Sequence, residues 1–296
     1  MNGPPPEPPV LLPDLPAAAA ARWPDRVAVS AGGDRLTHAA LAEASGRAAV
    51  WLRERGVRRG DRVVVVGPSS VLVPALLYGI ARLGAAFCLL HEQTRGRPLA
   101  HVLTDAEPAL LVAAEEPSIA LAGEHGVPAA DLAEAARRVL RGGGPAPAVP
   151  APGTLAVDPA CLIYTSGTTA APKAVVSTHA QMVFAALAIQ RVLAYRAGDV
   201  VYCPLPLSFD YGLYQLFLGA ASGAHVRLGG GALDAGPGLL RSLVEAGATI
   251  LASVPSVAEN LARLVRRSPG RVPPLRLLTN TGAAMPPQPL AELRAA

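Results

Sequence analysis

The most informative stretch of the chain is residues 164–173, Tyr-Thr-Ser-Gly-Thr-Thr-Ala-Ala-Pro-Lys, which lies between two apolar segments of strand character. Four aliphatic hydroxyls and one glycine precede a proline and a lysine. A loop of this composition turns backbone N–H groups and hydroxyls toward one anion, and the lysine adds a compact positive charge. The stretch therefore favours a polyphosphate site between two strands, although a polar surface turn uses the same residue types.

Lys173 is the single lysine among 296 residues, in a chain that otherwise uses arginine as its cation. An ammonium group is a point charge and a guanidinium group is a planar fork, so the two are not interchangeable at an anion site. The GxxxxGK[ST] spacing of a Walker A loop is absent. The position of the lysine indicates a phosphate site of a different kind.

Segments of strand and helix character alternate along the rest of the chain. Strands are predicted at residues 27–30, 35–37, 62–66, 86–90, 109–112, 119–122, 162–165, 174–177, 200–205, 225–228, 250–254 and 276–280. Helices are predicted at residues 39–55, 71–83, 98–104, 131–141, 178–193, 211–221, 238–245 and 256–266, and from residue 287. This alternation predicts an α/β fold of mostly parallel sheets covered by helices.

Composition narrows the class of protein. Hydrophobic residues make up 51% of the chain and aromatic residues 4%, which excludes a disordered or collagen-like chain and a base-stacking surface. The 26 basic and 22 acidic residues are interspersed, so no nucleic-acid partner is expected. Cys88, Cys161 and Cys203 lie in apolar runs without metal-ligand spacing, which predicts reduced core residues of a cytoplasmic protein and no metal site.

Other segments bear on domain organisation. Residues 1–16 are rich in proline and predict a loose tail without a secretory signal, and residues 141–153 predict a Gly/Pro/Ala linker. The apolar stretch Val63–Leu90 carries a single charge, Arg82, but a Gly-Pro-Ser-Ser turn interrupts it. This pattern favours a buried strand followed by a packed helix, and no membrane span is expected.

Residues 164–173 resemble the signature loop Tyr-Thr-Ser-Gly-Thr-Thr-Gly-x-Pro-Lys-Gly of the adenylate-forming superfamily. That superfamily includes acyl-CoA synthetases, aryl-CoA ligases, nonribosomal peptide adenylation domains and luciferases. Five other segments also resemble conserved segments of this superfamily, and they occur in the same order along the chain. They are residues 36–41, 60–63 and 82–86, before the loop, and residues 205–210 and 280–283, after it. The resemblance implies two similar α/β subdomains, one formed by residues 60–195 and the other by residues 17–58 with 196–296.

The resemblance also implies a two-step reaction. A carboxylic acid attacks the α-phosphate of ATP, with Mg²⁺, to give an acyl-adenylate and pyrophosphate. A thiol, from CoA or from phosphopantetheine, then takes the acyl group. The implied partners are an acyl carrier protein or a separate C-terminal domain. An aryl or acyl acid is favoured as the substrate over an amino acid.

Individual roles follow from the same resemblance. The β and γ phosphates would be held by Thr165, Ser166, Gly167, Thr168, Thr169 and Lys173. The adenine and one wall of the acyl pocket would be formed by Asn280, Thr281, Gly282, Ala283 and Ala284. The acyl or amino-acid pocket would include His179, Phe209, Asp210 and Tyr211. Purely structural alternatives are a hydrogen-bonded helix start for His179 and a helix cap for Asp210.

The chain departs from the family pattern in two ways. Ala170 and Ala174 stand where the family loop has glycine, which stiffens the loop if either position needs a positive φ. The chain also ends soon after the Asn280 turn, without the mobile C-terminal lid domain and its catalytic lysine. We therefore expect an N-terminal piece of a longer enzyme, or alternatively a short homologue that binds a nucleotide or partner. By itself the chain is expected to be a very poor ligase.

Overall fold

Two six-stranded sheets form the centre of the computed structural model, which describes residues 9–141, 153–165, 172–230, 236–268 and 274–295. Sheet A has the strand order β12 (Leu277–Asn280), β11 (Ile250–Ser253), β9 (Val200–Cys203), β10 (His225–Leu228), β1 (Val27–Ala31) and β2 (Asp34–Thr37). Sheet B has the order β6 (Ala129–Asp131), β5 (Leu110–Ala113), β3 (Arg62–Val66), β4 (Ala86–Leu90), β7 (Pro159–Thr165) and β8 (Lys173–Thr178). Only the edge strands β2 and β8 pair antiparallel within the described ranges, so the predicted α/β fold is confirmed.

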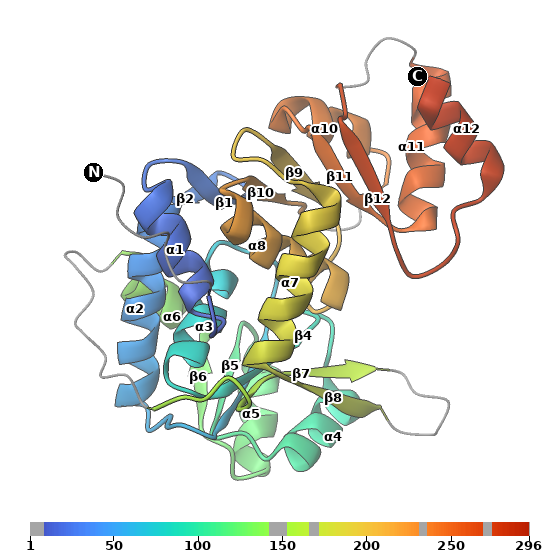
Figure 1. Cartoon of the computed structure of the whole chain (residues 1–296). Helices are drawn as coiled ribbons and strands as arrows, with labels where there is room; N and C mark the ends of the chain where they lie inside the picture. Colours follow the sequence, from blue (N-terminus) through green and yellow to red (C-terminus); the bar gives the residue numbers. More distant parts are fainter. Residues whose placement is uncertain (1–8, 142–152, 166–171, 231–235, 269–273, 296) are drawn as a thin grey trace, which may run out of the picture.

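Helices cover both sheets. Those that follow sheet B strands are α3 (Leu72–Arg82), α4 (Gly96–Ala106), α5 (Glu116–Glu124), α6 (Leu132–Leu140) and α7 (His179–Leu193). The remaining helices are α1 (Asp14–Arg22), α2 (His38–Glu54), α8 (Asp210–Ser222), α10 (Leu239–Ala246), α11 (Pro255–Arg267) and α12 (Pro287–Ala295). Figure 1 shows sheet A in the upper part of the molecule, sheet B in the lower part, and α7 running along the front from one to the other.

The stretch from residue 63 to residue 90 folds as a buried strand, helix and strand. The valines of β3 are all buried, as expected for an interior parallel strand. Helix α3 is buried from Leu72 to Ala81 because it packs between sheet B and α2. A Cβ added at Gly79 would lie 2.6 Å from the Ala48 Cβ, so glycine permits this close helix contact. No helix in the described residues is both long and apolar enough to cross a membrane.

Two segments differ from their predicted structure. Residues 119–122, predicted as a strand, lie within α5, which has proline in its first turn and buries Ser118 and Ala122 four residues apart. Helix α1 begins at Asp14, inside the segment expected to be a tail. Leu12 and Leu15 are fully buried there, which anchors a proline-rich segment that composition alone marks as loose.

Two buried histidines and one half-buried histidine lie where the charged form of the ring is disfavoured. Burial lowers the pKa of His38 and His179, whose side chains have almost no exposed surface. Burial and the nearby Arg227 lower the pKa of His225 to about 4, and its Nε2 lies 2.7 Å from the Ser30 Oγ. The folded protein therefore keeps these rings neutral at pH values where a histidine of an unfolded chain binds a proton.

We expect the free energy of unfolding to fall as the pH drops from about 6.5 to about 4. In this window the unfolded chain binds protons that the folded state does not, which costs the folded state on the order of 2 kcal/mol after a reduction for the partial exposure of His225. Urea unfolding across this pH range measures the slope. The substitution His225→Gln should flatten the slope, whereas exposed His125→Gln should not. An equal slope in both variants would contradict the assignment.

Candidate functional site

Residues 164–173, here called the Ser/Thr-rich loop, have their two ends held in an antiparallel hairpin at the edge of sheet B. Strands β7 and β8 pair so that Thr165 faces Lys173, and both residues are exposed. Ser166, Gly167, Thr168 and Thr169, together with Ala170 and Ala171, lie outside the described residues. The hairpin thus pairs the backbone of Thr165, the first aliphatic hydroxyl residue of the loop, with the backbone of Lys173, the last residue of the loop.

Helix α4 contacts both ends of this loop. The Tyr164 hydroxyl donates to Asp105 Oδ2 at 2.6 Å, and the His101 Nε2 lies 2.8 Å from the carbonyl oxygen of Pro172. The rings of His101 and Tyr164 meet edge to face, with centroids 6.2 Å apart. Burial and the hydrogen bond to Asp105 raise the pKa of Tyr164, so its hydroxyl remains a donor.

Helix α7 continues directly from β8. Thr178 and Gln181 form a capping box at its start, which fixes the direction in which the chain leaves the hairpin. His179 is fully buried in the first turn of α7, and its Nδ1 accepts a hydrogen bond from the backbone N–H of Leu12 at 3.2 Å. The structure thus ties His179 to the N-terminal segment before α1.

The turn at residues 280–284 follows β12 at the carboxyl edge of sheet A. The Asn280 side-chain amide donates to the Ala283 carbonyl at 2.8 Å, and the Thr281 N–H donates to the Ser253 carbonyl at 3.2 Å. Gly282 has φ +83°, a conformation that favours glycine. The Asn280 Oδ1 is buried without a partner among the described residues, so its capacity to accept a hydrogen bond is unsatisfied.

Residues 209–211 begin α8, next to this turn. Asp210 is exposed, and its Oδ1 accepts the N–H of Tyr211 at 2.7 Å. Burial raises the pKa of Tyr211, and a hydrogen bond with the Thr279 side chain partly offsets the increase. Since Thr279 immediately precedes the 280–284 turn, the structure brings together two segments that the sequence assigned separately to the acyl pocket.

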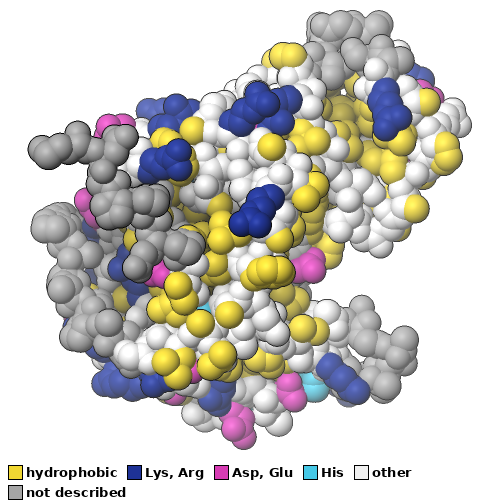
Figure 2. All heavy atoms as spheres, in the orientation of Figure 1, with side chains coloured by type: hydrophobic (Ala, Val, Ile, Leu, Met, Phe, Trp, Pro, Cys, Tyr) yellow, Lys and Arg dark blue, Asp and Glu magenta, His cyan; other side chains and the backbone are white. Residues whose placement is uncertain are grey.

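A cavity of about 530 Å³ lies between the carboxyl ends of the two sheets. It is lined by Gly67, Pro68, Ser69, Val73, Leu89, Leu90, His91, Glu92, Gln93, Pro204, Leu205, Pro206, Leu207, Ser208, Gly229, Gly230, Val254, Ser256 and Val257. Ligands of open parallel sheets bind at such strand ends. The space-filling view in Figure 2 shows the molecule hollowed between the part that carries α11 and α12 and the part that carries β7 and β8.

The cavity adjoins some of the predicted residues without including them. Ser208 precedes Phe209, and Val254 lies 3.8 Å from where a Cβ of Gly282 would be. Residues 67–69 and 89–93 also line the cavity, and they were not predicted from the sequence as part of the site. The signal that could have found them is positional, because each segment directly follows a buried parallel strand.

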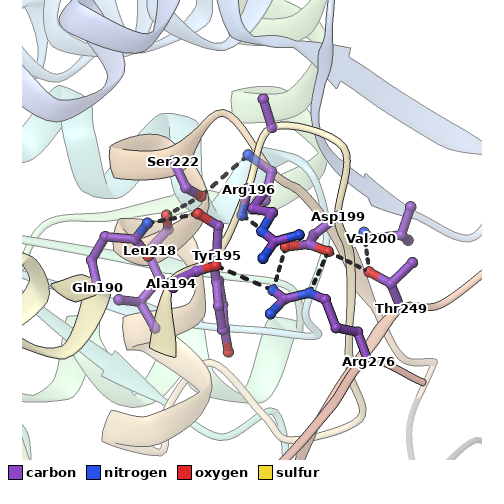
Figure 3. Close-up of polar contacts among 12 residues, drawn as sticks. Gln190, Ala194, Tyr195, Arg196, Asp199, Val200, Leu218, Ser222, Thr249 and Arg276 are labelled. Atoms are coloured by element: carbon purple, nitrogen blue, oxygen red, sulfur yellow. Dashed lines mark hydrogen bonds and ion pairs between the residues drawn. The ribbon is translucent and has the colours of Figure 1, made fainter. Parts of the chain in front are cut away.

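An ion pair fixes the opposite, amino edge of sheet A (Figure 3). Asp199 precedes β9 and Arg276 precedes β12, and the guanidinium contacts both carboxylate oxygens, at 3.2 and 2.6 Å. The Thr249 hydroxyl and the Arg196 N–H also donate to Asp199, at 2.9 and 2.7 Å. Burial raises the pKa of Asp199, but these hydrogen bonds outweigh it and leave the pKa below its ordinary value. The network links the residues that precede β9, β11 and β12, and the chain runs from β9 and β12 into predicted site segments.

Comparisons with known proteins agree on one family. The AMP-binding enzyme family matches residues 16–296. The salicyl-AMP ligase / salicyl-S-ArCP synthetase of Mycobacterium tuberculosis is 30% identical over 302 residues, which cover 94% of this chain and 52% of that protein. Syringomycin synthase SyrB1 of Pseudomonas syringae pv. syringae is 29% identical over 290 residues, which cover 95% of this chain and 45% of that protein. The chain thus spans about half the length of these two relatives.

Solved structures agree with the sequence comparisons. The crystal structure of VinN is 36% identical with a TM-score of 0.87, and the match covers 97% of this chain and 71% of VinN. The complex of VinN with L-aspartate is equally similar, and that match covers 96% of this chain and 72% of VinN. The sequence matches agree with the two mostly parallel sheets and with the sequence of the Ser/Thr-rich loop. The chain therefore belongs to the AMP-binding enzyme family.

Proposed function

We propose that this chain binds ATP and activates a carboxylic acid as its acyl-adenylate. The observation that carries the proposal is the hairpin that sets Thr165 opposite Lys173 at the edge of a parallel sheet. Hydroxyl, backbone N–H and ammonium donors on such a hairpin match the oxygens of a polyphosphate. Family membership supports the adenylation of an acid.

The phosphate loop, residues 164–173, would stabilise the pyrophosphate as it leaves. Thr165, Ser166, Gly167, Thr168, Thr169 and Lys173 are the proposed ligands of the β and γ phosphates. Preorganised donors of this kind act on charge that develops in the transition state. The described residues contain no group of three or more His, Cys, Asp or Glu side chains that could hold a metal. Magnesium would enter on the nucleotide phosphates, as it commonly does.

The turn at residues 280–284 is the proposed contact with the adenine and with one wall of the acyl pocket. The unpartnered Oδ1 of Asn280 suits an amino donor such as that of adenine. Gly282 lets the backbone of the turn approach a planar ring closely. Thr281, Ala283 and Ala284 complete the wall without adding bulk or charge.

The proposed acceptor of the acyl group is a thiol, of CoA or of the phosphopantetheine of a carrier protein. The cavity of about 530 Å³ between the sheets lies next to the proposed acyl pocket and is large enough for part of such an arm. Nonribosomal peptide synthetases among the relatives support a carrier protein as the partner. The buried, unpaired Cys88, Cys161 and Cys203 are consistent with the cytoplasm as the site of the reaction.

An amino acid is the second candidate for the acid. The exposed carboxylate of Asp210 is next to the proposed acyl pocket, and a carboxylate there can pair with an α-ammonium group. VinN, whose fold this chain shares, has been solved in complex with L-aspartate. Phe209 and Tyr211 would then form the apolar sides of the same pocket.

Titrations of the chain with candidate acids, in the presence of Mg·ATP, test both candidates. If the substrate is an amino acid, Asp210→Asn should weaken binding of that amino acid about 10- to 100-fold, because one charge-assisted contact is lost. Binding of Mg·ATP alone should be unchanged in this variant. Tight binding of salicylate or a fatty acid, without binding of any amino acid, would reject the second candidate. Failure of the chain to bind Mg·ATP would reject the proposed function itself.

A further inference from the structure

We propose that helix α4 positions the phosphate loop, with His101 and Asp105 acting as positioning residues for its two ends. The inference rests on the proposed function, because it assigns a role toward the loop that would bind ATP phosphates. Neither side chain belongs to the residues expected to touch the nucleotide. Their task would be to fix the hairpin from which those residues project.

The contacts reach the loop at both ends. Tyr164, the first residue of the loop, donates its hydroxyl to Asp105 at 2.6 Å. Pro172, immediately before Lys173, has its carbonyl oxygen 2.8 Å from the His101 Nε2. A carbonyl oxygen can only accept, so the Nε2 of His101 carries the hydrogen. One helix thus holds a residue near each end of the phosphate loop.

The spacing of the two side chains makes this possible. His101 and Asp105 are four residues apart on α4 and therefore project from the same face of the helix. The ring of His101 also meets the ring of Tyr164 at 82°, with centroids 6.2 Å apart. This edge-to-face geometry is favourable for aromatic pairs. The ring contact thus connects the residue that bonds Pro172, His101, with the residue that bonds Asp105, Tyr164.

Helix α4 is itself firmly anchored. Its opposite face buries Leu99, Val102, Leu103 and Ala106 in the core under sheet B. At its C-terminus, the Arg62 guanidinium donates to the carbonyls of Ala106 and Glu107 at 2.8 and 2.7 Å. Because Arg62 begins the central strand β3, the helix, the sheet and the loop ends form one continuous set of contacts.

A loop loses conformational entropy when it becomes ordered around an anion. This loss is smaller when both ends of the loop are already held before binding. Lys173 can direct its ammonium group at a phosphate only if the adjoining backbone is fixed. The carbonyl of Pro172 belongs to that backbone, and His101 holds it. The α4 contacts would therefore raise the affinity for Mg·ATP without contacting it.

Four variants of the chain test the proposal. His101→Phe removes the donor and keeps a ring against Tyr164, whereas His101→Gln restores a donor without a ring. Tyr164→Phe removes the hydroxyl that Asp105 accepts. The matched control is His125→Phe, because the His125 ring is also bonded to a backbone carbonyl, that of Leu121 at 2.9 Å, and lies at the end of α5, away from the loop. Each variant is titrated with Mg·ATP, and amide hydrogen exchange at Lys173, Ala174 and Val175 is measured without nucleotide.

We expect His101→Phe and Tyr164→Phe each to weaken Mg·ATP binding about 3- to 10-fold, the usual effect of one hydrogen bond. Both should also speed exchange at the three amides. His101→Gln should recover most of the affinity, and His125→Phe should match the wild-type chain in both measurements. Recovery by glutamine separates a lost donor from a general loss of packing.

Two results would overturn the proposal. One is a His101→Gln variant as impaired as His101→Phe, because a restored donor would then recover none of the affinity. The other is unchanged exchange in both His101→Phe and Tyr164→Phe. A wild-type chain that does not bind Mg·ATP would instead reject the proposed function, and the exchange measurements would still decide whether α4 holds the loop.

Discussion

The substitution Lys173→Ala is expected to weaken binding of Mg·ATP, or of Mg·pyrophosphate, about 10- to 100-fold. The ammonium group of Lys173 is the only cation in the phosphate loop, and no other lysine exists in the chain to replace it. Arg191→Ala is the control, because Arg191 is exposed in the last turn of α7 and belongs to none of the proposed site segments. Its affinity should stay within about 2-fold of the wild-type chain.

Calorimetric titration of the purified variants measures both effects. Lys173→Arg adds a finer comparison, since it keeps the charge but replaces a point charge with a planar fork. We expect it to recover only part of the lost affinity. Equal weakening by Lys173→Ala and Arg191→Ala would mean that the loop contributes general positive charge and not a phosphate contact.

The substitution Asp199→Ala is expected to lower the free energy of unfolding by about 2–4 kcal/mol, because it leaves Arg276 without its partner. The Asp199 side chain is 6% exposed and receives four hydrogen bonds from three residues, whose donors would all lose their acceptor. The Arg276 side chain is 30% exposed, so water replaces part of the interaction and keeps the loss below that of a fully buried pair.

Urea unfolding at neutral pH measures this loss, with Glu54→Ala as its control. Glu54 pairs with Arg138 at 3.2 Å, but both side chains are more than half exposed, so the control should change stability by less than about 0.5 kcal/mol. A loss as small in Asp199→Ala as in Glu54→Ala would show that the network of Figure 3 does not hold sheet A together.

Local sequence was enough to predict the two strands that flank the Ser/Thr-rich loop, but not their antiparallel pairing, which the structure shows. The loop itself was readily predicted. Its hydroxyls, glycine and lysine are contiguous, and the strands on either side have their own apolar pattern. The contacts of α4 with the loop could not be predicted in this way. Asp105 lies 59 residues before Tyr164, and only the order of strands in sheet B brings α4 next to β7. The cavity has the same origin, since loops from both sheets line it.

The errors at α1 and α5 have a common cause. In each segment the local residue types favour one state, proline for a loose tail and a short apolar run for a strand. Both segments are helical or anchored in the structure because tertiary contacts override the local preference. The first buries Leu12 and Leu15 in the core, and the second buries Ser118 and Ala122 along one helix face. Such tertiary contacts are invisible to a pattern that spans a few residues. The long alternation of strands and helices, by contrast, was sufficient to predict the fold class.

Sheet A pairs β1, near the N-terminus, with β10, from the second half of the chain, so this part of the sheet forms late during synthesis on the ribosome. Ser30 on β1 and His225 on β10 are in contact although 195 residues separate them. At a translation rate of about 5–20 residues per second, roughly 10–40 s pass between the synthesis of β1 and the synthesis of β10. During this time one side of β1 has unpaired backbone groups that another strand can bind. The nascent chain is therefore most exposed to aggregation at its N-terminal hairpin, and protection there by a chaperone should matter most before residue 228 is made.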